Sequence, residues 1–303
     1  MTKLSGSICL AVVLLLLVTM FGGTTALAIV PNGIPSGGRL FVVDGDESSQ
    51  ILELDPSTGA VLNSFPTPVP TNDGPEGLAY CNGRMFFVSS PEEGPSNIYE
   101  INPETGAVIN SFPAPPGLDA LGLSPDRLFA LDFVANTILV LNPNDGAPIT
   151  SYTQLPELLG GGTFAGTRDS LFFTGPPPDT IYELDPSNGA VLNSFPFPES
   201  AIDVYGLGFS ASRNTLFLGT YDGIDTIYEV NPNNGDVINS FPNPEGVHIS
   251  AMAADECDES PPQPVGGELF PVNKINIIAP FFALALLLVI GGGVLVWRQR
   301  LAQ

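Results

Sequence analysis

The chain has 303 residues, is 44% hydrophobic and carries a formal net charge of −23 at pH 7. From Arg39 to Glu268 it holds all 32 acidic residues and only five basic ones, which leaves this region near −27. Such a charge repels nucleic acid and excludes a nucleic-acid-binding function, whereas it attracts cations and also favours solubility.

The first 28 residues have the order of a secretory signal. Lys3 lies in a short polar start, an apolar run follows from Ile8 to Val18, and Ala26-Leu27-Ala28 provides small residues before a cut. We predict a signal peptide over 1–28 and a mature chain that begins near Ile29.

A sixteen-residue phrase returns five times after the signal. One copy is IYELDPSNGAVLNSFP, and successive copies start 47, 40, 43 and 46 residues apart, at Ile51, Ile98, Ile138, Ile181 and Ile227. One four-stranded blade of a β-propeller repeats at about this period. We therefore predict an all-β, five-bladed β-propeller over 29–257.

Each period contains four apolar patterns bounded by turn residues. In the second repeat they cover 77–80, 85–89, 98–102 and 107–112. The turn Asn102-Pro103-Glu104-Thr105-Gly106 combines an Asx side chain, a fixed proline φ and a glycine suited to positive φ. We expect the residues that begin these turns to be turn formers: Asp55, Asn102, Asn142, Asp185 and Asn231.

One arginine precedes the second strand of each predicted blade. This position favours a scaffold role, in which the guanidinium pairs with a neighbouring carboxylate or a turn carbonyl; a fivefold anion site is the alternative. The five are Arg39, Arg84, Arg127, Arg168 and Arg213.

The two ends of the repeat region complete each other. The first repeat has no inner strand before residue 40, and the last is followed by an extra inner-type strand over 248–253. We predict that this strand joins the first blade and closes the ring, leaving no exposed inner edge. Cys81 and Cys257 end equivalent segments, so we expect a disulfide between neighbouring blades, with two free thiols as the alternative.

The loops expected around the central channel are acidic. Several carboxylates on different loops suit Ca²⁺, which takes about six to eight oxygens, although acidic loops can also serve only solvation. We name Glu76 and Asp203 as metal-ligand candidates, and no catalytic residue. The channel-face binding candidates are Asp44, Asp46, Asp73, Glu76, Asp119, Asp203, Asp222 and Glu245.

The C-terminal region predicts a membrane anchor. Residues 258–274 are a Pro-rich, acidic spacer, and 275–297 is an uncharged stretch long enough to cross a hydrocarbon core of about 30 Å. The basic tail 298–303 places the cytoplasm after the span and the propeller outside. The phrase VGGELFPVNKINIIAP resembles C-terminal sorting tails of prokaryotic surface proteins but lacks their Pro-Glu-Pro motif, so a permanent anchor and a cleaved one both stand.

The repeats also resemble a known group of propellers. IYELDPSNGAVLNSFP and RLFVVD are similar to the YVTN and NHL-like repeats of prokaryotic surface proteins over roughly residues 39–256, which implies binding and cell-surface roles. The segment from Gly74 to Leu78 is similar to an inner-strand motif of gluconolactonase-like propellers, in which the Glu binds a metal, and to a segment of five-bladed glutaminyl cyclases.

These observations favour a membrane-anchored, non-enzymatic surface propeller that binds a protein, a glycan or a cation. The first alternative is a propeller enzyme, either a metal-dependent hydrolase of the lactonase type or a glutaminyl cyclase. The second is an architectural component of a surface coat.

Overall fold

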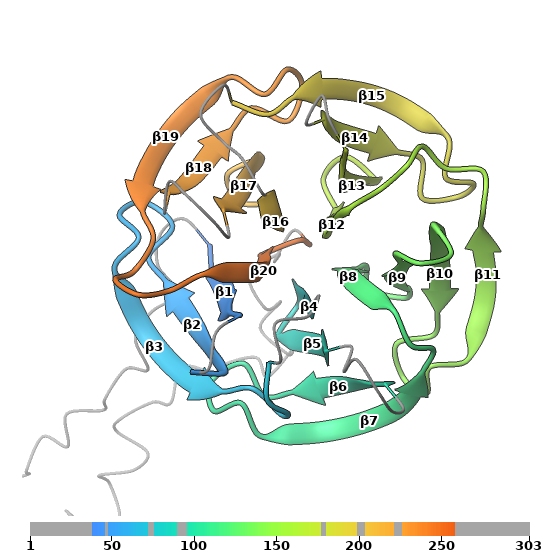
Figure 1. Cartoon of the computed structure of the whole chain (residues 1–303), viewed down its shortest axis with the longest axis horizontal. Coiled ribbons are helices and arrows are strands. Elements are labelled where there is room, and N and C mark those ends of the chain that lie inside the picture. The colour runs from blue at the N-terminus through green and yellow to red at the C-terminus, as the bar shows by residue number, and fades with distance from the viewer. Residues whose placement is uncertain are drawn as a thin grey trace, which may run out of the picture. The chain divides into compact units, whose positions relative to one another are not determined.

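The structure is a computed structural model that describes residues 38–45, 48–71, 76–89, 96–176, 180–198, 204–220 and 226–257. They form five antiparallel sheets of four strands each, arranged around a central axis as a five-bladed β-propeller (Figure 1). The predicted fold is confirmed, and the described residues contain no helix.

The predicted signal peptide, spacer, span and tail lie outside the described residues. The part of the chain that the structure describes contains no helix that is long and apolar enough to cross a bilayer. The membrane anchor therefore stays a prediction.

Each blade runs from an inner strand at the axis to an outer strand at the rim. The inner strands are β20 (Ile249–Ala254), β4 (Glu76–Cys81), β8 (Leu118–Leu123), β12 (Gly160–Ala165) and β16 (Val204–Ser210). The second strands are β1 (Leu40–Asp44), β5 (Arg84–Ser89), β9 (Leu128–Asp132), β13 (Ser170–Gly175) and β17 (Thr215–Thr220). The third strands are β2 (Gln50–Leu54), β6 (Ser96–Ile101), β10 (Thr137–Leu141), β14 (Thr180–Leu184) and β18 (Thr226–Val230). The outer strands are β3 (Val61–Pro66), β7 (Val108–Ala114), β11 (Pro148–Tyr152), β15 (Val191–Pro196) and β19 (Val237–Pro242). We number the blades 1 to 5 in this order.

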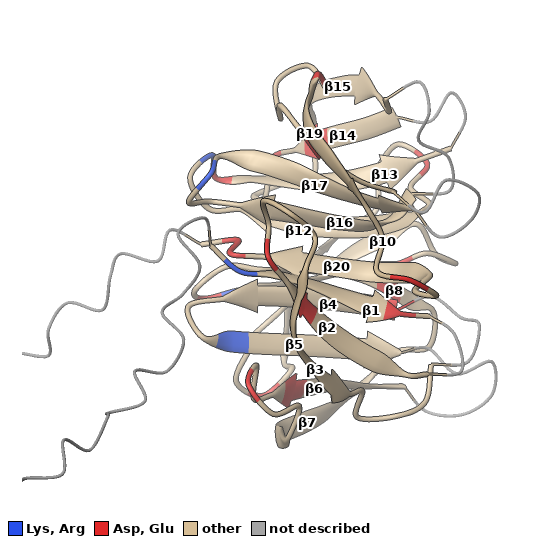
Figure 2. Cartoon of the chain, turned by 90° about the vertical axis from the view of Figure 1, so that its left-hand side faces the viewer, with Lys and Arg blue, Asp and Glu red and all other residues tan. Residues whose placement is uncertain are grey.

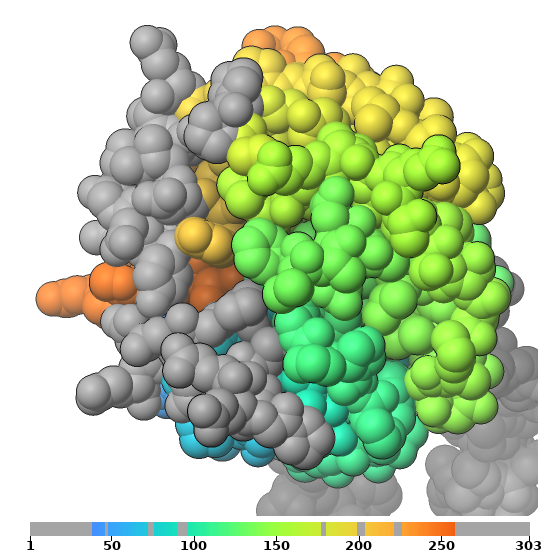
Figure 3. Space-filling view, turned by 45° about the vertical axis from the view of Figure 1, so that its right-hand side comes forward, coloured from blue at the N-terminus to red at the C-terminus, as the bar shows by residue number. Residues whose placement is uncertain are grey.

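Burial falls from the axis to the rim. The second strand of each blade carries a fully buried phenylalanine that packs between blades: Phe41, Phe86, Phe129, Phe172 and Phe217. Each outer strand begins with exposed aliphatic side chains, such as Ile109 at 62% exposure. Figure 3 shows the outer wall that blades 2 to 4 form. The hydrophobic effect thus holds the inner layers together and leaves the outer strands half solvated.

Blade 1 combines strands from the two ends of the repeat region, as predicted. Strand β20 pairs with β1 from Leu40↔Ala254 to Asp44↔Ile249, so the closing strand begins at Ile249, one residue later than the sequence suggested. Cys81 and Cys257 form the predicted disulfide, with Cα atoms 5.1 Å apart. The ring is therefore closed by a sheet and by a covalent bond.

The repeated turn joins the third and outer strands. In blade 2 the Asn102 side chain accepts hydrogen bonds from the N–H groups of Glu104 and Thr105, at 2.8 and 3.2 Å. Gly106 has φ 70° and lies so close to Phe65 of blade 1 that a Cβ would come within 2.6 Å of the ring. The turn-forming role is confirmed in all five blades, at Asp55, Asn102, Asn142, Asp185 and Asn231.

An arginine of one blade holds the turn of the next. Arg84 Nε donates to Glu100 Oε1 at 2.7 Å within blade 2, and Nη2 donates to the Pro143 carbonyl of blade 3 at 2.9 Å. Figure 2 shows the basic positions at one end of the strands. The predicted scaffold role is confirmed, because all five arginines reach the next blade's turn: Arg39, Arg84, Arg127, Arg168 and Arg213.

Blade 3 departs from this arrangement. Val140 occupies the third-strand position that is glutamate in the other four blades, as its pairing with Phe129 shows. The Nε of Arg127 is buried without a hydrogen bond, and its nearest carboxylate, Asp126 at 3.5 Å, has a side chain that is 79% exposed. Blade 3 therefore lacks the arginine–glutamate ion pair that joins the second and third strands in the other four blades.

Candidate functional site

The inner strands bring one equivalent position to the same end of the channel. The second strand of each blade has a first buried hydrophobic residue, which is Met85 in blade 2, and this residue pairs with one on the inner strand, here Tyr80. The position in question lies four residues before that partner, which in blade 2 is Glu76. We call the five residues at this position the mouth ring. From blade 1 to blade 5 they are Ser250, Glu76, Asp119, Gly160 and Tyr205.

β-Bulges turn part of the mouth ring out of the regular ladder. In blades 1, 3 and 5 the inner strand's pairing skips Ser250, Asp119 and Tyr205, whereas blade 2 keeps Glu76 paired with Ser89. In blade 4 the skipped residue is Gly161, next to the ring position. Because a bulge adds an unpaired residue and re-aims its side chain, the mouth differs from blade to blade although the rim repeats.

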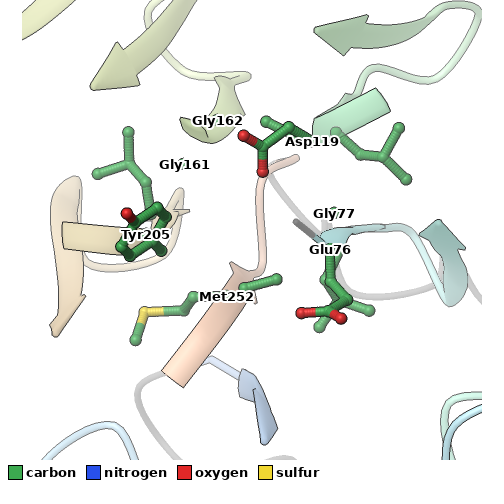
Figure 4. Close-up of a pocket in the computed structure, with 12 residues that line it drawn as sticks. Glu76, Gly77, Asp119, Gly161, Gly162, Tyr205 and Met252 are labelled. Atoms are coloured by element: carbon green, nitrogen blue, oxygen red, sulfur yellow. The ribbon is translucent and has the colours of Figure 1, made fainter. Parts of the chain in front are cut away.

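Glu76 and Asp119 form an acidic pair on neighbouring inner strands. Both are buried, with 1% and 4% exposure, and both line the narrow part of the channel shown in Figure 4. Burial, and secondly the negative charge of Glu76, raise the pKa of Asp119 to about 8. The Asp119 carboxyl therefore holds a proton near neutral pH until a positive group neutralises the site.

The space at this pair is small and mostly apolar. It measures about 140 Å³ including the part open to solvent, and no part of it holds a water-sized sphere. Leu78, Leu121, Leu207 and Met252 line it beside the two acids. It suits an ion or a single small group of a larger ligand rather than a whole organic substrate.

Residues 255–257 close the opposite end of the channel. Glu256 donates its N–H to the Tyr80 carbonyl, and its Oε2 accepts from the N–H groups of Leu123 at 2.6 Å and Phe164 at 3.4 Å. Glu256 is fully buried, which raises the pKa of its carboxyl well above the usual range. With Cys257 bonded to Cys81, the tail ties blades 2, 3 and 4 together, so a ligand would approach from the mouth ring.

The structure unites two of the eight predicted binding residues. Asp44 is buried elsewhere in blade 1, where its carboxylate accepts from the Ser48 hydroxyl and the His248 N–H. Glu245 is exposed and does not line the acidic pair's space. The remaining four lie outside the described residues: Asp46, Asp73, Asp203 and Asp222.

The predicted metal site is only half described. Glu76 lies at the mouth, but Asp203 is outside the described residues. Within the described ranges, no group of three or more His, Cys, Asp or Glu side chains is placed to hold a metal ion. The calcium prediction therefore stays a prediction.

Sequence reasoning missed four residues of this region. Three of them complete the mouth ring, namely Ser250, Gly160 and Tyr205, and the fourth, Glu256, closes the far end. Aligning the repeats on their second strands, rather than on the recurring phrase, would have identified the first three, since they share one offset. Nothing in the sequence distinguishes Glu256 from the acidic spacer that follows it.

Comparisons with known proteins do not assign a function to the chain. No protein-family model matches the chain, and no curated protein does. Similar solved structures include a glutaminyl cyclase of Myxococcus xanthus, with 10% identity, 68% of this chain and 75% of that chain covered, and a TM-score of 0.48. A protein of unknown function from Bacteroides caccae has 13% identity, 72% and 99% coverage and a TM-score of 0.47. A chain of the nidogen/laminin complex has 12% identity, 73% and 100% coverage and a TM-score of 0.46. At this level of similarity, function has to be argued from the chain's own site.

Proposed function

We propose that the protein is a membrane-tethered, cell-surface propeller that binds a positively charged ligand at the acidic mouth of its channel. The observation that carries this proposal is the buried pair of Glu76 and Asp119 at one end of a channel whose other end is closed. Two carboxyl groups that are difficult to ionise together are stabilised by a bound cation, and perturbed carboxyls in a cleft are typical of functional sites.

The cell-surface location is supported by the sequence. The signal-like segment 1–28, the apolar segment 275–297 and the basic tail 298–303 predict an outward-facing propeller. A membrane-impermeant carboxyl-reactive label applied to intact cells should modify the propeller, which is rich in Asp and Glu. Labelling only after lysis would contradict the orientation.

Thermal unfolding of the full chain in a neutral detergent tests the binding proposal. We expect CaCl₂ to raise the midpoint saturably, compared with NaCl at equal ionic strength, because a ligand that binds only the folded state stabilises it by mass action. Glu76→Gln and Asp119→Asn should each abolish the rise. Glu157→Gln, at an exposed acid, is the matched control and should keep it. A rise that persists in both mouth variants would place the cation elsewhere.

An enzyme is the second candidate, and one observation favours it. A carboxyl with a pKa of about 8 beside a second carboxyl is suited to general acid–base catalysis near neutral pH. Turnover of a lactone or of a peptide with N-terminal glutamine, lost in Glu76→Gln and kept in Glu157→Gln, would replace the binding proposal.

A further inference from the structure

Gly160 lies between the acidic side and the aromatic side of the mouth ring. A Cβ at this glycine would lie 3.2 Å from Asp119 Oδ2 and 3.5 Å from Tyr205 Cδ1. The carboxyl oxygen and the ring are therefore at most about 7 Å apart, the combined length of the two contacts. Because residue 160 is glycine, no side chain at this position separates the carboxyl from the ring.

The described lining combines carboxyl groups with apolar side chains. Two carboxyl groups supply part of the about six to eight oxygens that Ca²⁺ takes, and leucine and methionine side chains lie beside them. An organic ammonium group needs fewer polar partners. It is stabilised by carboxylates and by an aromatic ring within about 6 Å, and its carbon stem gains from apolar contact.

Tyr205 supplies the aromatic ring at the accessible side. It is 40% exposed, whereas Glu76 and Asp119 are buried, and Figure 4 shows the three side chains around the same space. Of the three side chains, the tyrosine ring is therefore the one that solvent reaches most.

We propose that the mouth ring recognises the ammonium group of an organic amine carried on an aliphatic stem. Glu76 and Asp119 neutralise its charge, Tyr205 packs against it, and the gap at Gly160 gives it access to both. The inference rests on the proposed function, that the mouth binds a cationic ligand, and it names the class of that ligand.

Isothermal titration of the full chain in neutral detergent with n-butylammonium chloride tests the proposal. We expect saturable binding that n-butanol and NaCl do not reproduce. Tyr205→Leu should weaken the affinity about tenfold while Tyr205→Phe retains it, because the ring and not the hydroxyl faces the cation. Gly160→Ala, which inserts a methyl group between acid and ring, should also weaken binding. Phe133→Leu changes another exposed aromatic residue, at 43% exposure, and should bind as wild type does.

The outcomes separate this inference from the proposed function. Saturable Ca²⁺ binding that needs Glu76 and Asp119, without butylammonium binding, would overturn the ammonium assignment and leave the cation-binding function standing. Butylammonium binding that is unchanged in Tyr205→Leu and Gly160→Ala would also overturn it. Absence of binding by either cation would overturn both proposals. Circular dichroism of each variant without ligand shows whether it is folded.

Discussion

The rim and the mouth of this propeller use the same five blades in opposite ways. At the rim the same contact recurs: Asn63 donates to the Glu104 carbonyl of the next blade at 3.1 Å, and Asn239 donates to the Ser57 carbonyl at 3.3 Å. At the mouth ring, five equivalent positions carry five different residue types. The residues that repeat in every blade thus stabilise the ring, whereas the positions that do not repeat can differ to suit a ligand.

The two regions also differ in how their charges are satisfied. Outside the mouth, glutamates of the third strands such as Glu229 on β18 are buried against an arginine, here Arg213 at 2.8 Å. At the mouth, Asp119 is buried beside another acid, and its pKa rises as a result. We expect the rim to add stability and the mouth to reduce it, as is common where a site is prepared for a ligand.

A large effect should come from the mouth and depend on pH. Because the pKa of Asp119 is raised from 3.8 to about 8, the folded protein keeps a proton between these values that the unfolded chain has lost. Stability should therefore fall as pH rises from 5 to 8, on the order of 3 kcal/mol from this group alone. Urea unfolding at pH 5, 6.5 and 8 with a chelator present measures it.

Asp119→Asn isolates this contribution, since the amide does not titrate. The variant should be more stable than wild type at pH 8 and should depend less on pH. If both proteins lose the same stability between pH 5 and 8, Asp119 is not the group responsible.

The next effect should come from the covalent closure. Replacing both Cys81 and Cys257 by alanine removes a bond between residues separated by 176 positions, and we expect a loss of about 2–5 kcal/mol. The urea midpoint reports the change. Cation binding at the mouth should survive, because the disulfide lies at the opposite end of β4. An unchanged midpoint would show that β20 alone closes the ring.

Replacing two equivalent arginines should then change the free energy of unfolding by different amounts. Arg39→Met leaves Glu53, whose side chain is 9% exposed, as an uncompensated buried charge and should cost about 3 kcal/mol. Arg127→Met removes a guanidinium whose carboxylate partner is exposed, and should cost about 1 kcal/mol or less. Equal losses of unfolding free energy in urea at pH 7 would show that the arginines stabilise the fold mainly through their contacts with the next blade's turn, and not through the glutamates.

The sequence predicted the parts of the molecule that the repeat determines. The period, the turns at residues such as Asn102, the closing strand and the disulfide all followed from spacing and are confirmed. The complete mouth ring did not follow, because bulges change the inner strand's register by one residue and no single residue type predicts a bulge. Of the eight acids predicted at the channel, the described structure brings Glu76 and Asp119 together and places Asp44 and Glu245 elsewhere, and the other four lie outside the described residues.

The smallest effect tests whether the rim's repeat is itself stabilising. Val140→Glu restores in blade 3 the glutamate of the other four blades, where it would face Arg127 Nε. We expect a gain of about 1 kcal/mol, since a buried donor acquires a charged acceptor. In the Arg127→Met background the same change should destabilise, because the new carboxylate would be buried without a cation. A double-mutant cycle in urea gives the coupling between the two positions. Coupling near zero would mean that Val140 does not face the Arg127 guanidinium, and that blade 3 differs from the other blades in shape as well as in charge.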